Sequence, residues 1–394
     1  MVEILVREFD AERDSHAVEE MERRCEVGPS GKPSIFTDFM GDAICRIRHS
    51  PVYLMLVAEY EGEKGIVGVI RGCIKTVTRG RKPFTDFPIY TKVAYILGLR
   101  VSPTHRRLGI GTKLVEKLEE WCRQKGAEYA YMATERGNQA SINLFTLKCA
   151  YIRFRTPTIL VQPVHVHRKP IGSSHAVIRL AAPLAESIYR RLFSAAEFFP
   201  KDIDAILSNQ LNLGTFMALP KKHLPVWDPQ ASRLPPSFAV MSVWNCKDVF
   251  KLQVKGVSPL TRAWCAGSRV LDGFMPWLQI PSIPDVFQPF GVYLLYGLYM
   301  EGKGGMGLMK ALCRFAHNMG RDDVGCGAIV AEVGRRDPVQ EAVPHWQRFS
   351  CAEDVWCMKR LVGEEYCDGG EGGPPDWVQS QPSSPVLFVD PREF

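Results

Sequence analysis

The stretch LRVSPTHRRLGIG, residues 99–111, lies between an apolar run and an amphipathic segment. The apolar run AYILGLRV, residues 94–101, predicts a long strand. Apolar residues at helical spacing then predict a helix over residues 109–124. Because glycine weakens the interior of a helix, Gly109 and Gly111 are expected to serve another purpose where this helix begins.

The two glycines suit a helix N-terminus that binds an anion. The first N–H groups of a helix have no partner within the helix, and the helix dipole attracts negative charge. Glycine lets a phosphate approach the backbone closely, and Arg106 and Arg107 add positive charge nearby. The stretch predicts a pyrophosphate site, with a tight turn that binds nothing as the alternative. It matches neither GxxxxGK[ST] nor GxGxxG.

The segments around this turn alternate between strand and helix patterns. The patterns predict strands over 3–9, 52–60, 65–77, 92–101, 127–134 and 151–157, and helices over 14–25, over 109–124 and from 138. This order is typical of an α/β fold built on one central sheet. We assign the unit to residues 1–163.

A second α/β unit is expected over residues 176–362. The apolar run FGVYLLYGLYM, residues 290–300, predicts a strand, and it precedes a helix that opens with Gly305 and Gly307. Another strand is predicted over residues 327–333. This unit therefore has the same strand, glycine turn, helix and strand as the first.

The spacing suggests that the second unit is a diverged copy of the first. Gly307 stands as far ahead of Glu332 as Gly111 stands ahead of Glu135, to within one residue. The arginine pair is missing from the second turn, so a copy is expected to have lost the anion site. An unrelated α/β domain is the alternative.

The chain ends in a Gly-, Pro- and Ser-rich tail, residues 363–394. Its last segment, VLFVDPREF (386–394), is apolar again, and we expect it to dock on the body of the protein.

The composition narrows the class of protein. The chain has 394 residues, of which 46% are hydrophobic and 23% charged, as in ordinary two-domain globular proteins. A net charge of +6 and the absence of zinc-finger or helix-turn-helix patterns give no reason to expect direct nucleic-acid binding. No apolar run approaches the ~20 residues that span a bilayer, so no membrane contact is expected. His165 and His167 lie near no cysteine or carboxylate cluster, and we predict no metal site.

The turn and a later segment together resemble the GNAT acyltransferases. Arg106, Gly109 and Gly111 fit the pattern [QR]xxGx[GA], the acetyl-CoA signature of that superfamily. The segment NQASINLF (138–145) resembles the second GNAT segment, NxxAxxLY. The resemblance covers residues 1–155 and implies a GNAT fold there, which is a mixed central sheet flanked by helices.

The resemblance narrows to the plant Hookless-like N-acetyltransferases. The segments that carry it are MERRCEVGPSGK (21–32), GLRVSPTHRRLGIG (98–111), SVWNCKD (242–248) and FVDPREF (388–394), which lie in both halves of the chain. It implies that the chain transfers an acetyl group from acetyl-CoA to an amine, which we take to be carried by a protein. It also implies a regulatory role in hormone-controlled differential growth and a place in the nucleus or the cytoplasm.

The same resemblance implies a set of cofactor-binding residues. In the family fold, the strand over residues 95–101 splays from its neighbour at a bulge, and the pantetheine of CoA fills the gap. Backbone groups of Leu99–Val101 would bond the pantetheine, and N–H groups of Arg107–Gly111 would hold the pyrophosphate. The predicted cofactor-binding residues are Leu99, Arg100, Val101, Arg106, Arg107, Leu108, Gly109, Ile110, Gly111, Asn138, Ser141 and Phe145.

Three residues are predicted to act in catalysis: Glu135, Asn138 and Tyr95. Acetyl transfer needs a neutral amine, a polarised thioester carbonyl and a proton for the leaving thiolate. Glu135, at the end of its strand, is the leading candidate for the base, and capping of the next helix is its alternative role. Tyr95 and His105 are weaker candidates, which we expect in the core and in a solvated loop. Asn138 is expected near the acetyl thioester.

The residue that would protonate the thiolate is not evident. Many GNAT enzymes have a tyrosine where this chain has Phe145, and phenylalanine cannot donate a proton. The alternative function is therefore an acetyl-CoA-binding regulator that has little or no catalytic activity and acts through protein partners.

Overall fold

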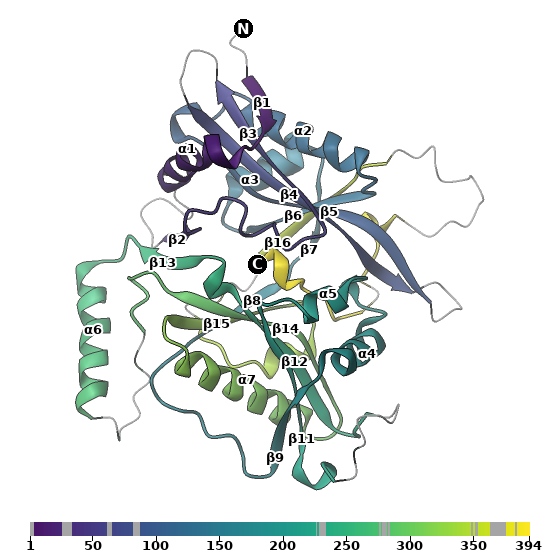
Figure 1. Cartoon of the computed structure of the whole chain (residues 1–394), viewed down its shortest axis with the longest axis vertical. Coiled ribbons are helices and arrows are strands. Elements are labelled where there is room, and N and C mark those ends of the chain that lie inside the picture. The colour runs from purple at the N-terminus through teal and green to yellow at the C-terminus, as the bar shows by residue number, and fades with distance from the viewer. Residues whose placement is uncertain are drawn as a thin grey trace.

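The computed structural model describes residues 4–25, 34–60, 65–81, 87–225, 227, 234–275, 277, 282, 284–347, 350, 354–362, 376–382 and 384–394. These residues form two large β-sheets that follow one another along the long axis of the molecule, and the C-terminal segment lies between them (Figure 1). None of the helices in these ranges is both long and apolar enough to cross a bilayer.

The first sheet has eight strands, and most of them come from the first half of the chain. Across the sheet they are β1 (Ile4–Glu8), β3 (Val52–Tyr60), β4 (Ile66–Arg81), β5 (Pro88–Val101), β6 (Tyr129–Glu135), β16 (Asp354–Arg360) and β7 (Ile152–Arg155), and β10 (Glu197–Pro200) also pairs with β4. Only β5 and β6 are parallel; the other neighbours are antiparallel. The resemblance implied a mixed sheet for residues 1–155, and the structure confirms it, with β10 and β16 added from further along the chain.

Helices cover both faces of the first sheet. On one face, which we call the α1 face, helix α1 (Ala11–Arg24) buries Val18 and Met21 in one cluster with Tyr95 and Tyr131. On the opposite face, the α2 face, lie α2 (Ile110–Gln124), α3 (Gln139–Asn143) and the π-helix η2 (Leu144–Lys148). Leu114 of α2 is fully buried there, as the apolar spacing predicts.

The second sheet repeats this plan with six strands. In order they are β8 (Thr158–Pro163), β15 (Cys326–Val333), β14 (Gly291–Glu301), β12 (Phe238–Asn245), β11 (Asn212–Pro220) and β9 (His175–Leu180), and only β14 and β15 are parallel. Helices α4 (Ala182–Phe193) and α5 (Ile203–Leu207) cover one face, and α7 (Gly305–Asp322) covers the other. The second half is thus a GNAT-like α/β unit.

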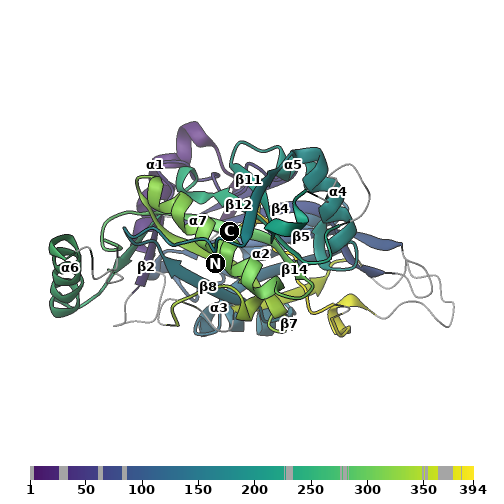
Figure 2. The same cartoon turned by 90° about the horizontal axis from the view of Figure 1, so that it is seen from below.

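The remaining elements are short or stand apart. Strand β2 (Ser34–Asp38) pairs with β13 (Lys251–Lys255), and α6 (Pro259–Phe274), which follows β13, stands away from both sheets (Figure 1, Figure 2). Single 3₁₀ turns are η1 (Pro103–His105), η3 (Lys221–His223), η4 (Cys246–Asp248), η6 (Pro338–Glu341), η8 (Trp377–Gln379) and η9 (Pro391–Glu393).

The two sheets exchange strands. Strand β8 follows β7 directly in the chain, yet it pairs with β15 in the second sheet, where Thr158 lies opposite Val333. Strand β16 comes from the end of the second half, yet it lies between β6 and β7 of the first sheet. The division into units 1–163 and 176–362 stays a prediction, since β8 and β16 each complete the sheet of the other half.

The segment at residues 386–394 packs between the sheets, as its apolar sequence predicted. The Nζ atom of Lys75 on β4 lies 3.3 Å from a carboxylate oxygen of Asp390 and 2.6 Å from one of Glu393. All three side chains are almost fully buried. Residues 363–375 of the predicted tail lie outside the described residues.

Candidate functional site

Strands β5 and β6 run side by side and then separate. Their parallel pairing joins Val93–Ile96 to Tyr129–Met132, and the described residues form no further pair between them. On its other side β5 stays paired with β4 as far as Val101. The end of β5 therefore has one edge without a neighbouring strand, as the resemblance implied for residues 95–101.

A bulge at Gly98 causes this separation. Gly98 has a φ of +62°, which L side chains rarely adopt, and the register between β4 and β5 shifts beside it. Arg71 of β4 packs under the bulge: its Nε donates to the carbonyl of Ala43 at 2.6 Å, and its Nη1 lies 2.8 Å from Glu22. The Nη2 atom of Arg71 is buried and has no hydrogen-bond partner among the described residues.

Helix α2 begins with an uncapped N-terminus. Its N-cap is Gly109, with a φ of +85°, and no side chain accepts a hydrogen bond from the first turn. A β-carbon on Gly109 would meet nothing within 4 Å, so the backbone there is open to a ligand. Arg106, Arg107 and Leu108 are exposed around the turn, while Ile110 anchors the helix in the core.

These features fit acetyl-CoA. Free N–H groups at a helix N-terminus, with two exposed arginines beside them, suit a pyrophosphate. At the unpaired edge of β5, backbone groups of Leu99–Val101 would bond the amides of pantetheine, and these three residues are only half buried. Gly111 follows on α2, and a β-carbon there would lie 3.3 Å from Cδ2 of Leu144. Glycine thus keeps the helix close to η2.

Asn138 caps helix α3. Its Oδ1 accepts a hydrogen bond from the N–H of Ser141 at 3.2 Å, and its Nδ2 donates to Thr134 Oγ1 at 3.1 Å. Thr134 lies near the end of β6, beyond the last residue paired with β5. The cap therefore ties α3 to the part of β6 that borders the separation.

Phe145 lies in the core. Its side chain is 1% exposed and meets the ring of Tyr151 edge-on at 5.1 Å. Its contribution to a cofactor site stays a prediction.

The candidate bases occupy different surroundings. Glu135 is exposed at the end of β6, and the helix that follows is capped by Asn138. Tyr95 is buried on the α1 face, where burial raises the pKa of its hydroxyl well above 10. His105 was expected in a solvated loop, which is wrong: it is 7% exposed, because the turn η1 directs its ring against Tyr60 at 5.3 Å.

The second half of the chain contributes carboxyl groups to the α1 face of the first sheet, the face on which Tyr95 lies. Asp354 of β16 lies directly opposite Glu135 of β6, and Trp356 donates its indole N–H to Glu332 of β15 at 3.1 Å. Burial, followed by the charge of Asp354, raises the pKa of Glu332 to about 8. Burial also raises the pKa of Asp354 to about 7. No local motif marks these residues, because the strand exchange alone brings them here.

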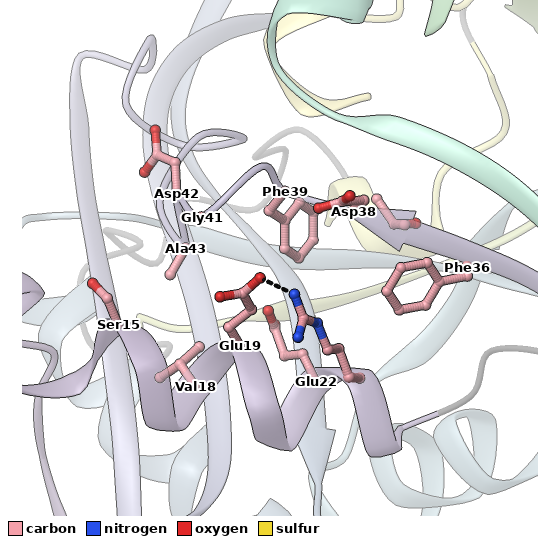
Figure 3. Close-up of a pocket in the computed structure, with 12 residues that line it drawn as sticks. Ser15, Val18, Glu19, Glu22, Phe36, Asp38, Phe39, Gly41, Asp42 and Ala43 are labelled. Atoms are coloured by element: carbon pink, nitrogen blue, oxygen red, sulfur yellow. Dashed lines mark hydrogen bonds and ion pairs between the residues drawn. The ribbon is translucent and has the colours of Figure 1, made fainter. Parts of the chain in front are cut away.

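A pocket lies on the α1 face between α1 and the segment made of β2 and the residues that follow it (Figure 3). Figure 3 shows its acidic and aromatic lining, which includes Glu19, Glu22, Asp38, Phe36 and Phe39. Through Glu22 it connects to Arg71 and so to the bulge. Residues 26–33, between α1 and β2, and residues 82–86, between β4 and β5, lie outside the described residues.

The second half repeats the bulge without the anion site. Pairing of β14 with β15 ends at Leu295, and Gly297 has a φ of +59°. A β-carbon on Gly297 would lie 2.6 Å from the ring of Tyr189, so the tyrosine fills this position. The helix cap is Gly304, which places the acidic Glu301 at the position that Arg106 has in the first half.

The two halves also differ in the position of their glutamates. Pairing ends at Met132 in β6 and at Ala331 in β15, so Glu332 corresponds to Ala133 in the structure. The sequence spacing matched Glu332 to Glu135 instead, which is wrong by two residues.

The bulged strand and the uncapped helix define the class of GNAT acyltransferases, and the Acetyltransferase (GNAT) family profile matches residues 15–151. The chain is 54% identical to Probable N-acetyltransferase HLS1 of Arabidopsis thaliana over 99% of this chain and 100% of that protein. It is 44% identical to Acetyl transferase GW6a of Oryza sativa subsp. japonica, over 99% and 97% of the two chains. The chain belongs to this plant, Hookless-like family of GNAT N-acetyltransferases.

A solved structure supports the two-sheet fold. Saccharomyces cerevisiae N-myristoyltransferase with bound myristoyl-CoA matches with a TM-score of 0.55 over 91% of this chain and 79% of that chain. Sequence identity is 8%, so the match shows the fold alone.

Proposed function

We propose that the chain transfers the acetyl group of acetyl-CoA to an amine carried by a protein. This proposal rests on one combination of features, an uncapped helix N-terminus at Gly109 together with the strand bulge at Gly98. The first suits the pyrophosphate and the second exposes backbone groups to the pantetheine. Acetyl-CoA would supply an acyl group already activated as a thioester.

The residues of this chain would position the two substrates. Arg106, Arg107 and the N–H groups up to Gly111 would hold the pyrophosphate, and Asn138 would support the end of β6 beside the thioester. The acceptor amine would approach from the α1 face, through the pocket of Figure 3. Asp38 would present a carboxylate to it there, while Glu19 and Glu22 already pair with Arg23 and Arg71. A lysine side chain or a free N-terminus has the required charge.

Binding is tested with Gly109→Glu combined with Gly111→Glu. The new side chains place negative charge and bulk where the pyrophosphate would bind, so calorimetry should detect acetyl-CoA binding by the wild type and none by the variant. Gly267→Glu, in open space on α6, is the matched control and should bind like the wild type. A wild-type protein that does not bind acetyl-CoA would contradict the proposal.

The second candidate function is a regulator that binds acetyl-CoA without efficient transfer. Phe145 favours it, because it cannot protonate the thiolate. Incubation with labelled acetyl-CoA and a pool of synthetic peptides, each with a free N-terminus and one lysine, separates the two. Transfer of the label to peptides would support the acetyltransferase function. Binding of acetyl-CoA without any labelled peptide would support the regulator.

The biological setting that we propose is hormone-controlled differential growth, with the chain in the nucleus or the cytoplasm. This rests on the resemblance to the Hookless-like family. A fluorescent fusion expressed in a plant that lacks the protein would test the location and the rescue of growth together.

A further inference from the structure

We propose that Glu332, a residue of the second half, is the general base that takes the proton from the acceptor amine. This inference rests on the proposed acetyl transfer and names a residue for one of its steps. It gives the second half, which has lost the features of an anion site, a role in the reaction of the first.

The strand exchange places Glu332 beside the separation of β5 and β6. Strand β16 pairs with β6 past the point where β5 leaves it, and Trp356 lies opposite Ala133, one residue beyond the last paired Met132. Residues that are directly opposite in antiparallel strands point to the same face of the sheet. The indole of Trp356 therefore lies on the α1 face, and its N–H donates a hydrogen bond to Glu332.

A stack of aromatic rings connects this carboxyl to the bulged strand. The ring of Trp356 lies 5.3 Å from that of Tyr131, which lies 4.9 Å from that of Tyr95. Tyr95 stands next to Ile96, the last residue of β5 that pairs with β6. The carboxyl of Glu332 is near enough to act on the ionisation of Tyr95. The carboxyl of Glu332 thus lies near the end of the paired segment, on the side of the sheet that carries α1.

The surroundings of Glu332 favour a proton acceptor. None of the ion pairs found in the described residues includes Glu332, whose one hydrogen bond there is from Trp356. The charged groups that act on its ionisation are Asp354 of β16 and Glu393 of the C-terminal segment, both acidic, while the hydrogen bond from Trp356 acts in the opposite direction. Together with burial they raise the pKa of Glu332 to about 8. A base with a pKa near the working pH is the most effective for proton transfer.

The neighbouring candidates are less suited to this step. Glu135 is exposed, so water screens its interactions with a substrate. The hydroxyl of Tyr95 has its pKa raised well above 10 and would have to ionise in the core. Asp354 has a raised pKa as well, and its negative charge raises the pKa of Glu332.

In the step, the carboxylate of Glu332 takes one proton from the ammonium group of the acceptor. The neutral amine nitrogen then forms a bond to the acetyl carbon while the bond from that carbon to sulfur breaks. The thiolate of CoA leaves and takes the second proton that the nitrogen releases. Glu332 returns its proton to water, so the products are the acetylated amine, CoA thiol and one proton.

The test compares the wild type with Glu332→Gln, which keeps the shape of the side chain and an oxygen that can accept from Trp356. The acceptors are the peptide pool described above, and release of CoA thiol gives the rate. We expect kcat/KM to fall about 100-fold, with loss of the rise in rate around pH 8, while calorimetry shows unchanged acetyl-CoA binding. Glu341→Gln, an exposed residue of the same half, is the matched control.

A second variant checks the assignment by a shift in pH dependence. The hydrogen bond from Trp356 lowers the pKa of Glu332, so Trp356→Phe should move the midpoint of the rate profile to higher pH. Wild-type rates and profiles in Glu332→Gln, or an unmoved midpoint in Trp356→Phe, would overturn the role of Glu332 and leave acetyl transfer standing. A wild type that binds acetyl-CoA and transfers nothing would instead overturn the proposed function, and the base with it.

Discussion

A β-carbon on Gly98 would lie 2.7 Å from Nη1 of Arg71. The guanidinium cannot move aside freely, because it is buried and bonded to Ala43 and Glu22. The strand separation at the candidate site therefore depends on the absence of a side chain at position 98.

Gly98→Ala should destabilise the protein. A positive φ costs a non-glycine residue about 1–2 kcal/mol, and the contact with Arg71 adds to this. We expect the free energy of unfolding, from urea titration, to fall by about 2 kcal/mol or more. Gly267→Ala, in a helix and in open space, should cost nothing. Equal stability of the two variants would mean that the bulge tolerates a side chain.

Arg106→Ala combined with Arg107→Ala should weaken acetyl-CoA binding about tenfold, which corresponds to about 1.4 kcal/mol. Both side chains are exposed, so salt screens their attraction to phosphate. Wild-type affinity should therefore fall with ionic strength more steeply than that of the variant. Lys221→Ala with Lys222→Ala removes the same charge from a distant turn and should leave the affinity unchanged. An effect of the lysine pair as large as that of the arginine pair would point to net charge alone.

The protein should bind one acetyl-CoA per chain. The glycine turn before α7, which corresponds to the turn before α2, has Glu301 in place of Arg106. A β-carbon on Gly302 in this turn would meet the carbonyl oxygen of Pro236. Tyr189 fills the space beside the second bulge. Calorimetric titration should give a stoichiometry near one, and that stoichiometry should drop to zero in the Gly109→Glu, Gly111→Glu variant. A second site that survives in the variant would contradict this prediction.

Lys75→Met should destabilise the fold by about 3–5 kcal/mol, because it leaves the buried carboxyls of Asp390 and Glu393 without their shared cation. Lys117→Met removes an exposed lysine whose ion pair within the described residues is with Glu120 on the same helix, and it should change the free energy of unfolding by less than about 0.5 kcal/mol. Urea titration measures both. A small effect at Lys75 would show that the C-terminal segment is held by its apolar residues instead.

Stability should fall as the pH rises towards 8, and Glu332 should be one cause. The pKa of Glu332 is raised from 4.5 to about 8, so the folded state holds the proton more tightly than the unfolded state. Its contribution is complete below about pH 4.5 and is lost as the pH rises through 8, at about 1.4 kcal/mol for each pH unit. Glu332→Gln should flatten this slope in urea titrations from pH 5 to 9. An unchanged slope would show that Glu332 ionises normally.

The local pattern of the sequence predicted much of the first sheet. Strands β3 and β4 and helix α2 follow from apolar spacing and from the glycine turn. The separation of β5 from β6 follows from the resemblance. The repeat of β14, α7 and β15 was visible for the same reason. These elements are defined by residues close in sequence, where periodicity is informative.

The strand exchange could not be predicted in the same way. Strands β8 and β16 are short segments whose pattern is equally suited to either sheet, and pairing partners far apart in sequence leave no local signal. As a result, the sequence placed Glu332 with Glu135 and gave no indication that Asp354 would lie opposite Glu135. The carboxyl groups of Glu135, Glu332 and Asp354 are therefore brought together by tertiary structure, which no local sequence pattern indicates.

The exchange of β8 and β16 has a consequence for how the chain is made. During synthesis, β6 and β7 leave the ribosome long before β16, at residues 354–360, exists to lie between them. The first sheet must wait with two open edges until translation is almost finished. Exposed strand edges promote aggregation, so nascent chains should depend on chaperones more heavily than those of a protein whose domains close in order.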